Sequence, residues 1–223
     1  MVVVSLAPIA PYMDRCGLAS STRQVARDLW GDSLPNRPLA TLTRELYHAE
    51  NEHRAEPSGS QDMIGLIYPG VSRLDYSIDC HEGCFPVHIE SNCEPRIAAW
   101  IEDVIQLVPV CQRPPGYNPL TIRNLDPGWI GRLGKSGQAC YDSISAMDIK
   151  GLGESLNECV RCWEAILPCT LRHPTLLANL VELLRSYQSR YFGAMYSGCG
   201  GGYLQVVSKE PVPGALRVKV RIA

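Results

Sequence analysis

Apolar residues spaced three and four apart predict the helices of the first part of the chain. One apolar face runs along residues 38–54, and its members are Leu39, Leu42, Leu46 and Ala49. Pro38 stands in the first turn, where a helix tolerates the missing N–H of proline. A second helix is predicted over residues 20–30, because Ser20 and Ser21 occupy the position of an N-cap.

The second half of the chain shows the same helical spacing at four places. Helices are predicted over residues 97–103, 129–149, 152–166 and 174–191. The last of them carries a stripe of leucines, which are Leu176, Leu177, Leu180, Leu183 and Leu184. A stripe of this kind is typical of a helix face that packs into a core.

Strand patterns are interspersed with these helices. Residues 2–5 predict a buried strand, and residues 63–90 predict a hairpin region with strands at 73–78 and 85–90. Near the end, a glycine turn leads into a strand at 203–208. Residues 216–222 then alternate apolar and basic side chains, which is typical of an antiparallel edge strand. We therefore expect an α+β fold with two domains, residues 1–95 and 96–223.

Charge and hydropathy narrow the function classes. The chain has 21 basic and 23 acidic residues, a formal charge of -2, which gives no electrostatic footprint for nucleic acid or an anionic membrane. No apolar run approaches the roughly 20 residues that span a bilayer. The apolar start lacks the basic residues of a secretory signal. We expect a cytoplasmic protein that binds any anion locally.

Ten cysteines are scattered along the chain. Two groups have spacings that suggest metal ligands, and they are Cys80, His81, Cys84 and His88, and separately Cys159 with Cys162. The second pair has no matching pair elsewhere and lies in a predicted helix interior. We therefore interpret most cysteines as small buried side chains, not as zinc ligands or a disulfide framework.

Two turns of small residues have the composition of phosphate-binding loops. The first, Gly17-Leu18-Ala19-Ser20-Ser21, precedes a helix whose unpaired N–H groups attract anions. The second, Ser197-Gly198-Cys199-Gly200-Gly201-Gly202, allows close backbone approach. Neither has the Gly-Lys-Ser of a P-loop. Taken alone, the first is more often an ordinary N-cap and the second more often a bulge.

Between these turns lies Pro57-Ser58-Gly59-Ser60-Gln61-Asp62, with Glu50 about two helical turns upstream. Phosphoryl transfer requires a metal ion and a group that orients or deprotonates the attacking hydroxyl. Glu50 as a metal ligand and Asp62 as the base would fill these two roles. The sequence therefore predicts phosphoryl transfer to a small molecule.

These segments resemble the GHMP kinase superfamily, which includes galactokinases and the homoserine, mevalonate and phosphomevalonate kinases. Residues 16–22 are similar to its second motif, residues 198–202 to its third, and Glu50 with residues 57–62 to the intervening Glu and Pro-Ser-Gly-x-Asp of mevalonate kinases. Features around residues 60–74 look closer to bacterial sugar kinases. The resemblance implies a partial GHMP fold, with a remnant of the N-terminal domain and a C-terminal ferredoxin-like α/β sandwich with an antiparallel sheet.

The resemblance also implies roles for individual residues. Asp62 would be catalytic, and Ser20, Ser21 and Glu50 would hold Mg²⁺. ATP would bind along two segments, whose residues are Gly17, Leu18, Ala19, Ser20, Ser21, Gly198, Gly200, Gly201 and Gly202. The implied reaction transfers the γ-phosphoryl group of ATP to a hydroxyl of a sugar or sugar phosphate.

The chain departs from the family pattern in two respects. Ala19 replaces a glycine of the phosphate loop, and the family's first motif, Pro-Gly-Arg followed by Gly-Glu-His, is not found. The alternative is therefore a catalytically silent relative that acts as a binding or regulatory protein, or one half of a split kinase. An unpaired edge beside residues 2–5 would then favour self-association or an N-terminal partner chain.

Overall fold

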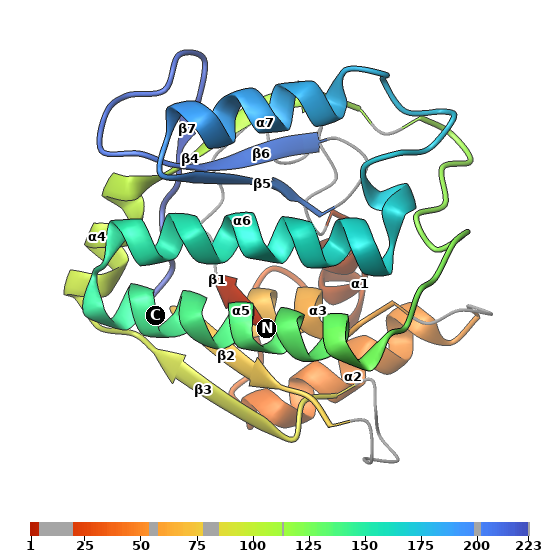
Figure 1. Ribbon diagram of the computed structural model, residues 1–223. Helices are drawn as coiled ribbons and strands as arrows, with labels where there is room; N and C mark the ends of the chain where they lie inside the picture. Colours follow the sequence, from red (N-terminus) through yellow and green to blue (C-terminus); the bar gives the residue numbers. More distant parts are fainter. Residues whose placement is uncertain (5–19, 54–57, 78–84, 113, 199–201, 223) are drawn as a thin grey trace. The chain divides into compact units, whose positions relative to one another are not determined.

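The structure is a computed structural model that describes residues 1–4, 20–53, 58–77, 85–112, 114–198 and 202–222 (Figure 1). The chain divides into two compact units. Unit 1 comprises residues 1–98 and 219–223, and unit 2 comprises residues 99–218. Helices and antiparallel strands occur in both, so the predicted α+β class is confirmed. Within the described residues, no helix has both the length and the apolar character needed to cross a membrane.

Three helices of unit 1 share one core. They are α1 (Ser20–Trp30), α2 (Leu39–Asn51) and α3 (Gln61–Ile67). Leu42 and Leu46 of α2 are fully buried against Met63 and Ile67 of α3, and Val25 of α1 packs against the same cluster. The predicted helix over residues 20–30 is confirmed, and the helix predicted over residues 38–54 spans a slightly shorter range because Pro38 is its N-cap.

The sheet of unit 1 has the order β1-β2-β3 and is antiparallel throughout. Its strands are β1 (Val2–Val4), β2 (Val71–Asp75) and β3 (His88–Asn92). The paired β2 and β3 confirm a hairpin in this region. β1 lies at the sheet edge and is half-buried, which corrects the expectation of a buried strand. Association through that edge stays a prediction.

The apolar run at residues 63–67 corrects the predicted hairpin region, because it forms α3. Met63, Ile64 and Ile67 are buried at helical spacing. Gly70 then takes a φ of +74°, and a Cβ there would lie 2.2 Å from the Asn92 carbonyl oxygen. Glycine is therefore needed where the chain turns from α3 into β2.

Residues near the C-terminus complete unit 1. The Arg221 guanidinium donates a hydrogen bond of 2.8 Å to the Leu66 carbonyl oxygen in the last turn of α3. The Gly70 N–H donates to the Arg221 carbonyl oxygen at 2.7 Å. Burial lowers the pKa of Arg221 from its ordinary value. Arg221 thus satisfies a helix-end carbonyl that has no partner within the helix.

Unit 2 is built on an antiparallel sheet with the order β5-β6-β4-β7. The boundary between the units falls within α4 (Pro95–Val104), which leads directly into β4 (Ile105–Cys111). The other strands are β5 (Gly193–Ser197), β6 (Gly202–Val207) and β7 (Leu216–Arg217). β7 lies at the edge, as its alternating pattern predicts, but it is two residues long instead of seven.

A helical hairpin follows β4. Its helices are α5 (Pro127–Ala146) and α6 (Ile149–Ile166) (Figure 1). The Asp126 carboxylate accepts a hydrogen bond from the Trp129 N–H, so α5 begins two residues earlier than predicted. Met147 takes a left-handed conformation with φ 55°, and Asp148 then caps α6. This short turn reverses the chain between the two helices.

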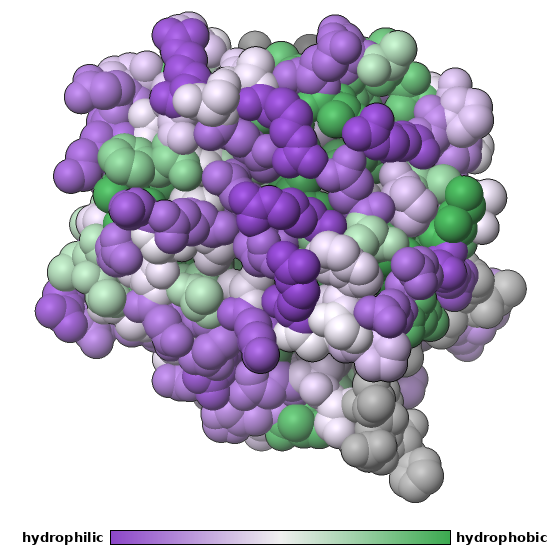
Figure 2. Space-filling view, in the orientation of Figure 1, coloured by the Kyte–Doolittle hydropathy of each residue, from purple (hydrophilic) through white to green (hydrophobic). Residues whose placement is uncertain are grey.

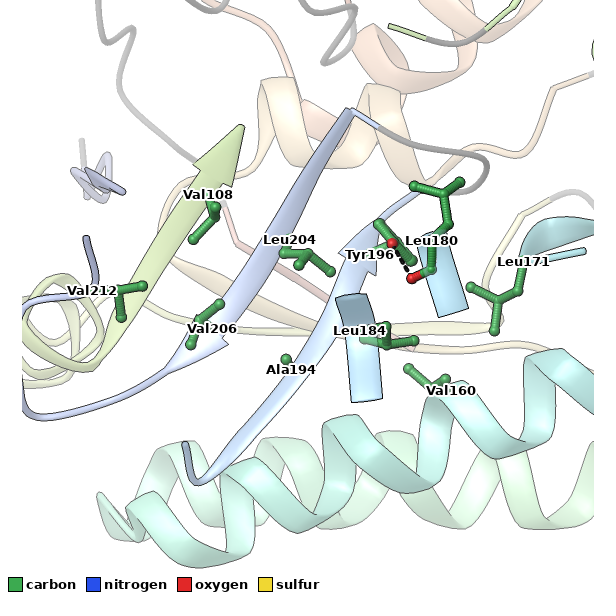
Figure 3. Close-up of a cluster of buried hydrophobic side chains, with 10 residues drawn as sticks. All are labelled: Val108, Val160, Leu171, Leu180, Leu184, Ala194, Tyr196, Leu204, Val206 and Val212. Carbon is green, nitrogen blue, oxygen red and sulfur yellow. Dashed lines mark hydrogen bonds between the residues drawn. The ribbon is translucent and has the colours of Figure 1, made fainter. Parts of the chain in front are cut away.

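One core joins α6 and α7 (Leu180–Arg190) to the sheet of unit 2 (Figure 3). Its buried members are Val108, Val160, Leu171, Leu180, Leu184, Ala194, Tyr196, Leu204, Val206 and Val212. The helix predicted over residues 174–191 begins only at Leu180, after a short 3₁₀ helix, η1 (Pro168–Thr170), and a turn segment. Leu180 and Leu184 are core residues as predicted, whereas Leu177 is 54% exposed.

Candidate functional site

The start of α1 is the first element of the predicted site. Ser20 is the first residue of α1, so a helix N-terminus lies where the sequence predicts one. Gly17, Leu18 and Ala19 lie outside the described residues, and only the backbone of Ser20 and Ser21 is described. Their assignment to nucleotide and metal stays a prediction.

The predicted metal ligand Glu50 lies in the last turn of α2 and is half-buried. Its Oε1 accepts a hydrogen bond from the Ser58 hydroxyl at 3.4 Å, and its Oε2 is shielded from solvent. Asn51 holds Ser58 in place, because its Oδ1 accepts from the Ser58 N–H at 2.7 Å and lies 3.2 Å from the Ser58 hydroxyl. A carboxylate and a hydroxyl therefore converge just before α3.

The predicted base Asp62 lies in the first turn of α3 and is exposed. Ser60, just before it, is fully buried, and its hydroxyl is 3.2 Å from the Tyr76 hydroxyl. A Cβ on Gly59 would lie 2.1 Å from the Gln61 side-chain oxygen, so any larger residue at position 59 requires the flexible Gln61 side chain to move. The residues just before α3 are thus held by polar contacts, through Ser58 to the last turn of α2 and through Ser60 to Tyr76.

Sequence reasoning named Ser58 and Ser60 only as parts of a motif and did not name Asn51 or Tyr76. Asn51 follows Glu50 directly, so the polar pair that these two residues form at the end of α2 could have indicated Asn51 as a site residue. Tyr76 is 16 positions from Ser60, and no local spacing connects them. The contact arises because β2 follows α3 in the same unit.

The glycine-rich turn lies in unit 2, between β5 and β6. Ser197 pairs with Tyr203, so residues 198–202 connect two hydrogen-bonded strands. Gly198 and Gly202 have φ values of +91° and +81°, which a residue with a side chain rarely adopts. Gly200 and Gly201 lie outside the described residues. The backbone freedom that a phosphate loop needs is present at both flanks of the turn.

A register shift accompanies this turn in the neighbouring strand. Pro109 of β4 pairs with Tyr203, but Cys111 pairs with Gly202, so one residue of β4 is unmatched. Proline lacks the N–H that a regular ladder uses, which accounts for an irregularity here. The start of α1 belongs to unit 1 and the glycine-rich turn to unit 2, and their convergence on one triphosphate stays a prediction.

The described cysteines are free thiols. Burial raises the pKa of Cys140 and of Cys159 to about 11, and it also raises the pKa of Cys162. Cys159 and Cys162 lie inside α6, in agreement with the prediction of a helix interior. Cys80, His81 and Cys84 lie outside the described residues. In the part of the chain that is described, no three His, Cys, Asp or Glu side chains come together as metal ligands.

Comparison with known proteins identifies the fold. No family model matches the sequence, and no curated protein does. Among solved structures, a sugar kinase assigned only by similarity, from Campylobacter jejuni, superposes with a TM-score of 0.57 at 12% identity, over 92% of this chain and 61% of that one. A D-glycero-D-manno-heptose 1-phosphate kinase from Bacteroides thetaiotaomicron gives 0.55 at 13% identity, over 91% and 60%.

A third solved structure is the mevalonate diphosphate decarboxylase of Enterococcus faecalis, described for its ATP binding mechanism. It gives a TM-score of 0.51 at 14% identity, over 96% of this chain and 67% of that one. The chain thus spans about three-fifths of the length of the two kinases. These likenesses show that the chain has a GHMP kinase-like fold, as the resemblance implied.

Proposed function

We propose that the chain is an ATP-dependent phosphotransferase that moves the γ-phosphoryl group of ATP to a hydroxyl of a sugar or sugar phosphate. The observation that carries the proposal is that Ser58, just before α3 with its Asp62, is hydrogen-bonded to Glu50 and Asn51 at the end of α2. The fold supports it, because a heptose 1-phosphate kinase is among the structures that superpose. The oxygen-rich surroundings of Glu50 match what phosphoryl transfer requires.

Magnesium fits the side chains near Glu50. Mg²⁺ prefers oxygen ligands and takes few of them from the protein, while nucleotide phosphates and water provide the rest. The Glu50 carboxylate, with Ser20 or Ser21 from the start of α1, would provide such a small set. When bound, the ion would neutralise charge that develops on the transferred phosphate. Ser58 holds one oxygen of Glu50 and leaves the carboxylate fixed in orientation.

Asp62 would receive the proton of the acceptor hydroxyl. Its exposure leaves the carboxylate accessible to a substrate, and the first turn of α3 fixes its position. Gly198, Gly200, Gly201 and Gly202 would allow the backbone to approach a phosphate or the acceptor closely. ATP is the proposed donor, in keeping with the ATP binding described for the decarboxylase that superposes.

The first experiment measures ATP binding by calorimetry with and without Mg²⁺. The proposal expects saturable binding that strengthens with Mg²⁺. Absence of saturable binding would defeat it. The second experiment screens sugars and sugar phosphates for ADP release. Binding without turnover on every acceptor would favour the alternative of a silent relative or of one half of a split kinase.

Variants then test the two carboxylates. Asp62→Asn is expected to lower kcat by about 10² to 10⁴-fold while ATP binding persists, because a general base acts mainly in the transition state. Glu50→Gln is expected to weaken the response to Mg²⁺. Asp142→Asn, on the exposed face of α5, is the matched control and should change neither property. Unchanged turnover of Asp62→Asn would disprove the role of that residue.

A further inference from the structure

A surface hollow of about 300 Å³ lies in unit 2, along the segment that connects η1 to α7. Leu171 is 6% exposed at this hollow and belongs to the core of unit 2. Leu176 and Val181 pack against the same core, and Leu177 is exposed to solvent. The hollow therefore has an apolar lining that a ligand can reach from water.

Arg172 supplies a positive charge to this lining. Its Nε and Nη2 donate to Oε1 of Glu164 at 3.3 and 3.0 Å, while Arg185 donates to Oε2 of the same carboxylate at 2.6 Å. One carboxylate neutralises only one of the two guanidinium groups, so the three side chains together carry a charge of +1. Within the described residues, Nη1 of Arg172 donates no hydrogen bond.

His173 adds a second donor. Its Nδ1 accepts a hydrogen bond from the Thr175 N–H at 3.3 Å and lies 2.7 Å from the Thr175 hydroxyl. A ring nitrogen that accepts from a backbone N–H carries no proton, so the neutral imidazole bears its proton on Nε2. Among the described residues, Nε2 has no hydrogen-bond partner.

The imidazole is also held in place by its neighbours. The ring of Tyr117 meets it edge to face, with 5.3 Å between the ring centroids and an angle of 86° between the planes. The Tyr117 hydroxyl in turn donates to the Cys169 carbonyl oxygen in η1 at 2.7 Å. The donor on His173 is therefore preorganised, which lowers the entropy cost of binding a ligand.

We propose that this hollow binds a small amphipathic anion, a carboxylate or phosphate monoester with an apolar body of roughly six to ten carbon atoms. Arg172 and His173 hold the anionic group, and Leu176, Leu177 and Val181 contact the apolar body. The two donors and the apolar wall all come from unit 2. None of these residues belongs to the phosphotransferase site proposed above.

Three probes separate the contributions of charge and apolar surface. They are 4-phenylbutyrate, which has both features, 4-phenylbutan-1-ol, which lacks the charge, and acetate, which lacks the apolar body. Calorimetry on the full chain should show saturable binding of 4-phenylbutyrate and at least tenfold weaker binding of the other two. Equal binding of the alcohol or of acetate would overturn the proposal.

Variants locate the site. Arg172→Gln should weaken 4-phenylbutyrate binding at least fivefold, and Leu177→Ser, at an exposed position, should weaken it severalfold. Arg161→Gln is the matched control, because Arg161 is an exposed arginine of unit 2 that pairs with Glu158, away from the hollow. A loss with Arg161→Gln equal to that with Arg172→Gln would contradict the site, as would full binding by Arg172→Gln.

Competition with nucleotide distinguishes this site from the proposed kinase site. Binding of 4-phenylbutyrate should not change when Mg·ATP is added. Displacement by Mg·ATP would place the probe in the nucleotide site and overturn the proposal. If the chain binds no ATP, the phosphotransferase proposal fails, but the probe and variant experiments on the hollow keep their full meaning.

Discussion

Gly153 of α6 and Gly193 of β5 pack backbone against backbone. A Cβ on Gly193 would lie 2.2 Å from the Gly153 carbonyl oxygen, and a Cβ on Gly153 would lie 2.2 Å from the Phe192 carbonyl oxygen. Neither atom can move aside as a flexible side chain does. The two glycines therefore set how closely α6 approaches the sheet of unit 2.

Gly153→Ala and Gly193→Ala are each expected to lower the free energy of unfolding by about 2 to 3 kcal/mol, because the added methyl group overpacks a backbone contact. Urea denaturation measures the effect. The control is Gly131→Ala in α5, where nothing lies within 4 Å of the added Cβ. That variant should stabilise by about 0.5 to 1 kcal/mol through helix propensity. A stable Gly153→Ala protein would contradict the close approach.

Met147→Gly is expected to raise the free energy of unfolding by about 0.5 to 1 kcal/mol. Met147 has a φ of 55° at the turn between α5 and α6, and left-handed backbone strains a residue with a Cβ. The reciprocal change is Gly214→Ala, where φ is +73° and the Cβ would meet no atom within 4 Å. Gly214→Ala should destabilise by about 1 kcal/mol. Thermal melting of both variants tests the pair, and shifts of the same sign would contradict the expectation.

Tyr196→Phe is expected to cost about 1 kcal/mol of stability. The Tyr196 hydroxyl donates to the Leu180 carbonyl oxygen at 2.6 Å inside the core (Figure 3). Burial, with a smaller effect from Cys111, raises the pKa of Tyr196 above its ordinary value. The folded protein therefore keeps this proton at pH values where the unfolded chain loses it.

The sign of the pH effect follows from that raised pKa. The contribution of Tyr196 is complete below the ordinary tyrosine pKa of about 10 and declines as the pH rises further. The free energies of unfolding of wild type and Tyr196→Phe should accordingly converge as the pH rises above about 10. A difference that grows above pH 10 would show that the hydroxyl is not buried and bonded as described.

Glu158→Gln is expected to lower stability by about 1 kcal/mol at neutral pH and low salt. Glu158 bonds Arg132 and Arg161, and its side chain is 25% exposed. It lies on α6. Hydrophilic side chains are frequent on the face of the molecule that Figure 2 shows. Partial burial alone would raise the pKa of Glu158, but the hydrogen bonds and charges of the two arginines lower it overall.

Acid and salt should both weaken this contribution. Because the folded pKa lies below the ordinary glutamate value of about 4.3, the stabilisation is present above that pH and is lost as the pH falls through the folded pKa. The difference between wild type and Glu158→Gln should therefore shrink in acid, and also in 1 M salt. Lys150→Gln, in an exposed pair with Glu154, should change stability far less.

Local patterns predicted most helices, because a periodic apolar face records which side of a helix is buried. The leucines of α2 are an example. The alternating apolar and basic residues likewise predicted that β7 lies at a sheet edge. The same reasoning did not recognise residues 63–67 as a helix, since a short apolar run fits a strand and a helix equally well. Leu177 was wrongly placed in a core helix because a stripe of leucines does not show where its first turn begins.

The candidate site could be predicted only in part. The sequence indicated Glu50 and Asp62 through their spacing from a Pro-Ser-Gly turn. The structure places Glu50 in the last turn of α2 and Asp62 in the first turn of α3, and their roles stay predictions. The contacts that hold this region were not predictable. Tyr76 reaches Ser60 across a strand connection, and Arg221 reaches Leu66 across 155 positions. Such contacts depend on tertiary packing and leave no periodic signal.

The hydrogen bonds between Arg221, Leu66 and Gly70 affect the order in which the protein forms during synthesis. Unit 2 is one uninterrupted stretch, so it can fold as soon as residue 218 has left the ribosome. Unit 1 cannot form these two hydrogen bonds until Arg221 has been made, although most of its residues are made earlier. We therefore expect unit 1 to be completed after unit 2, although N-terminal domains generally fold first. A chain that ends at residue 218 should accordingly keep a protease-resistant unit 2 beside an incompletely folded unit 1.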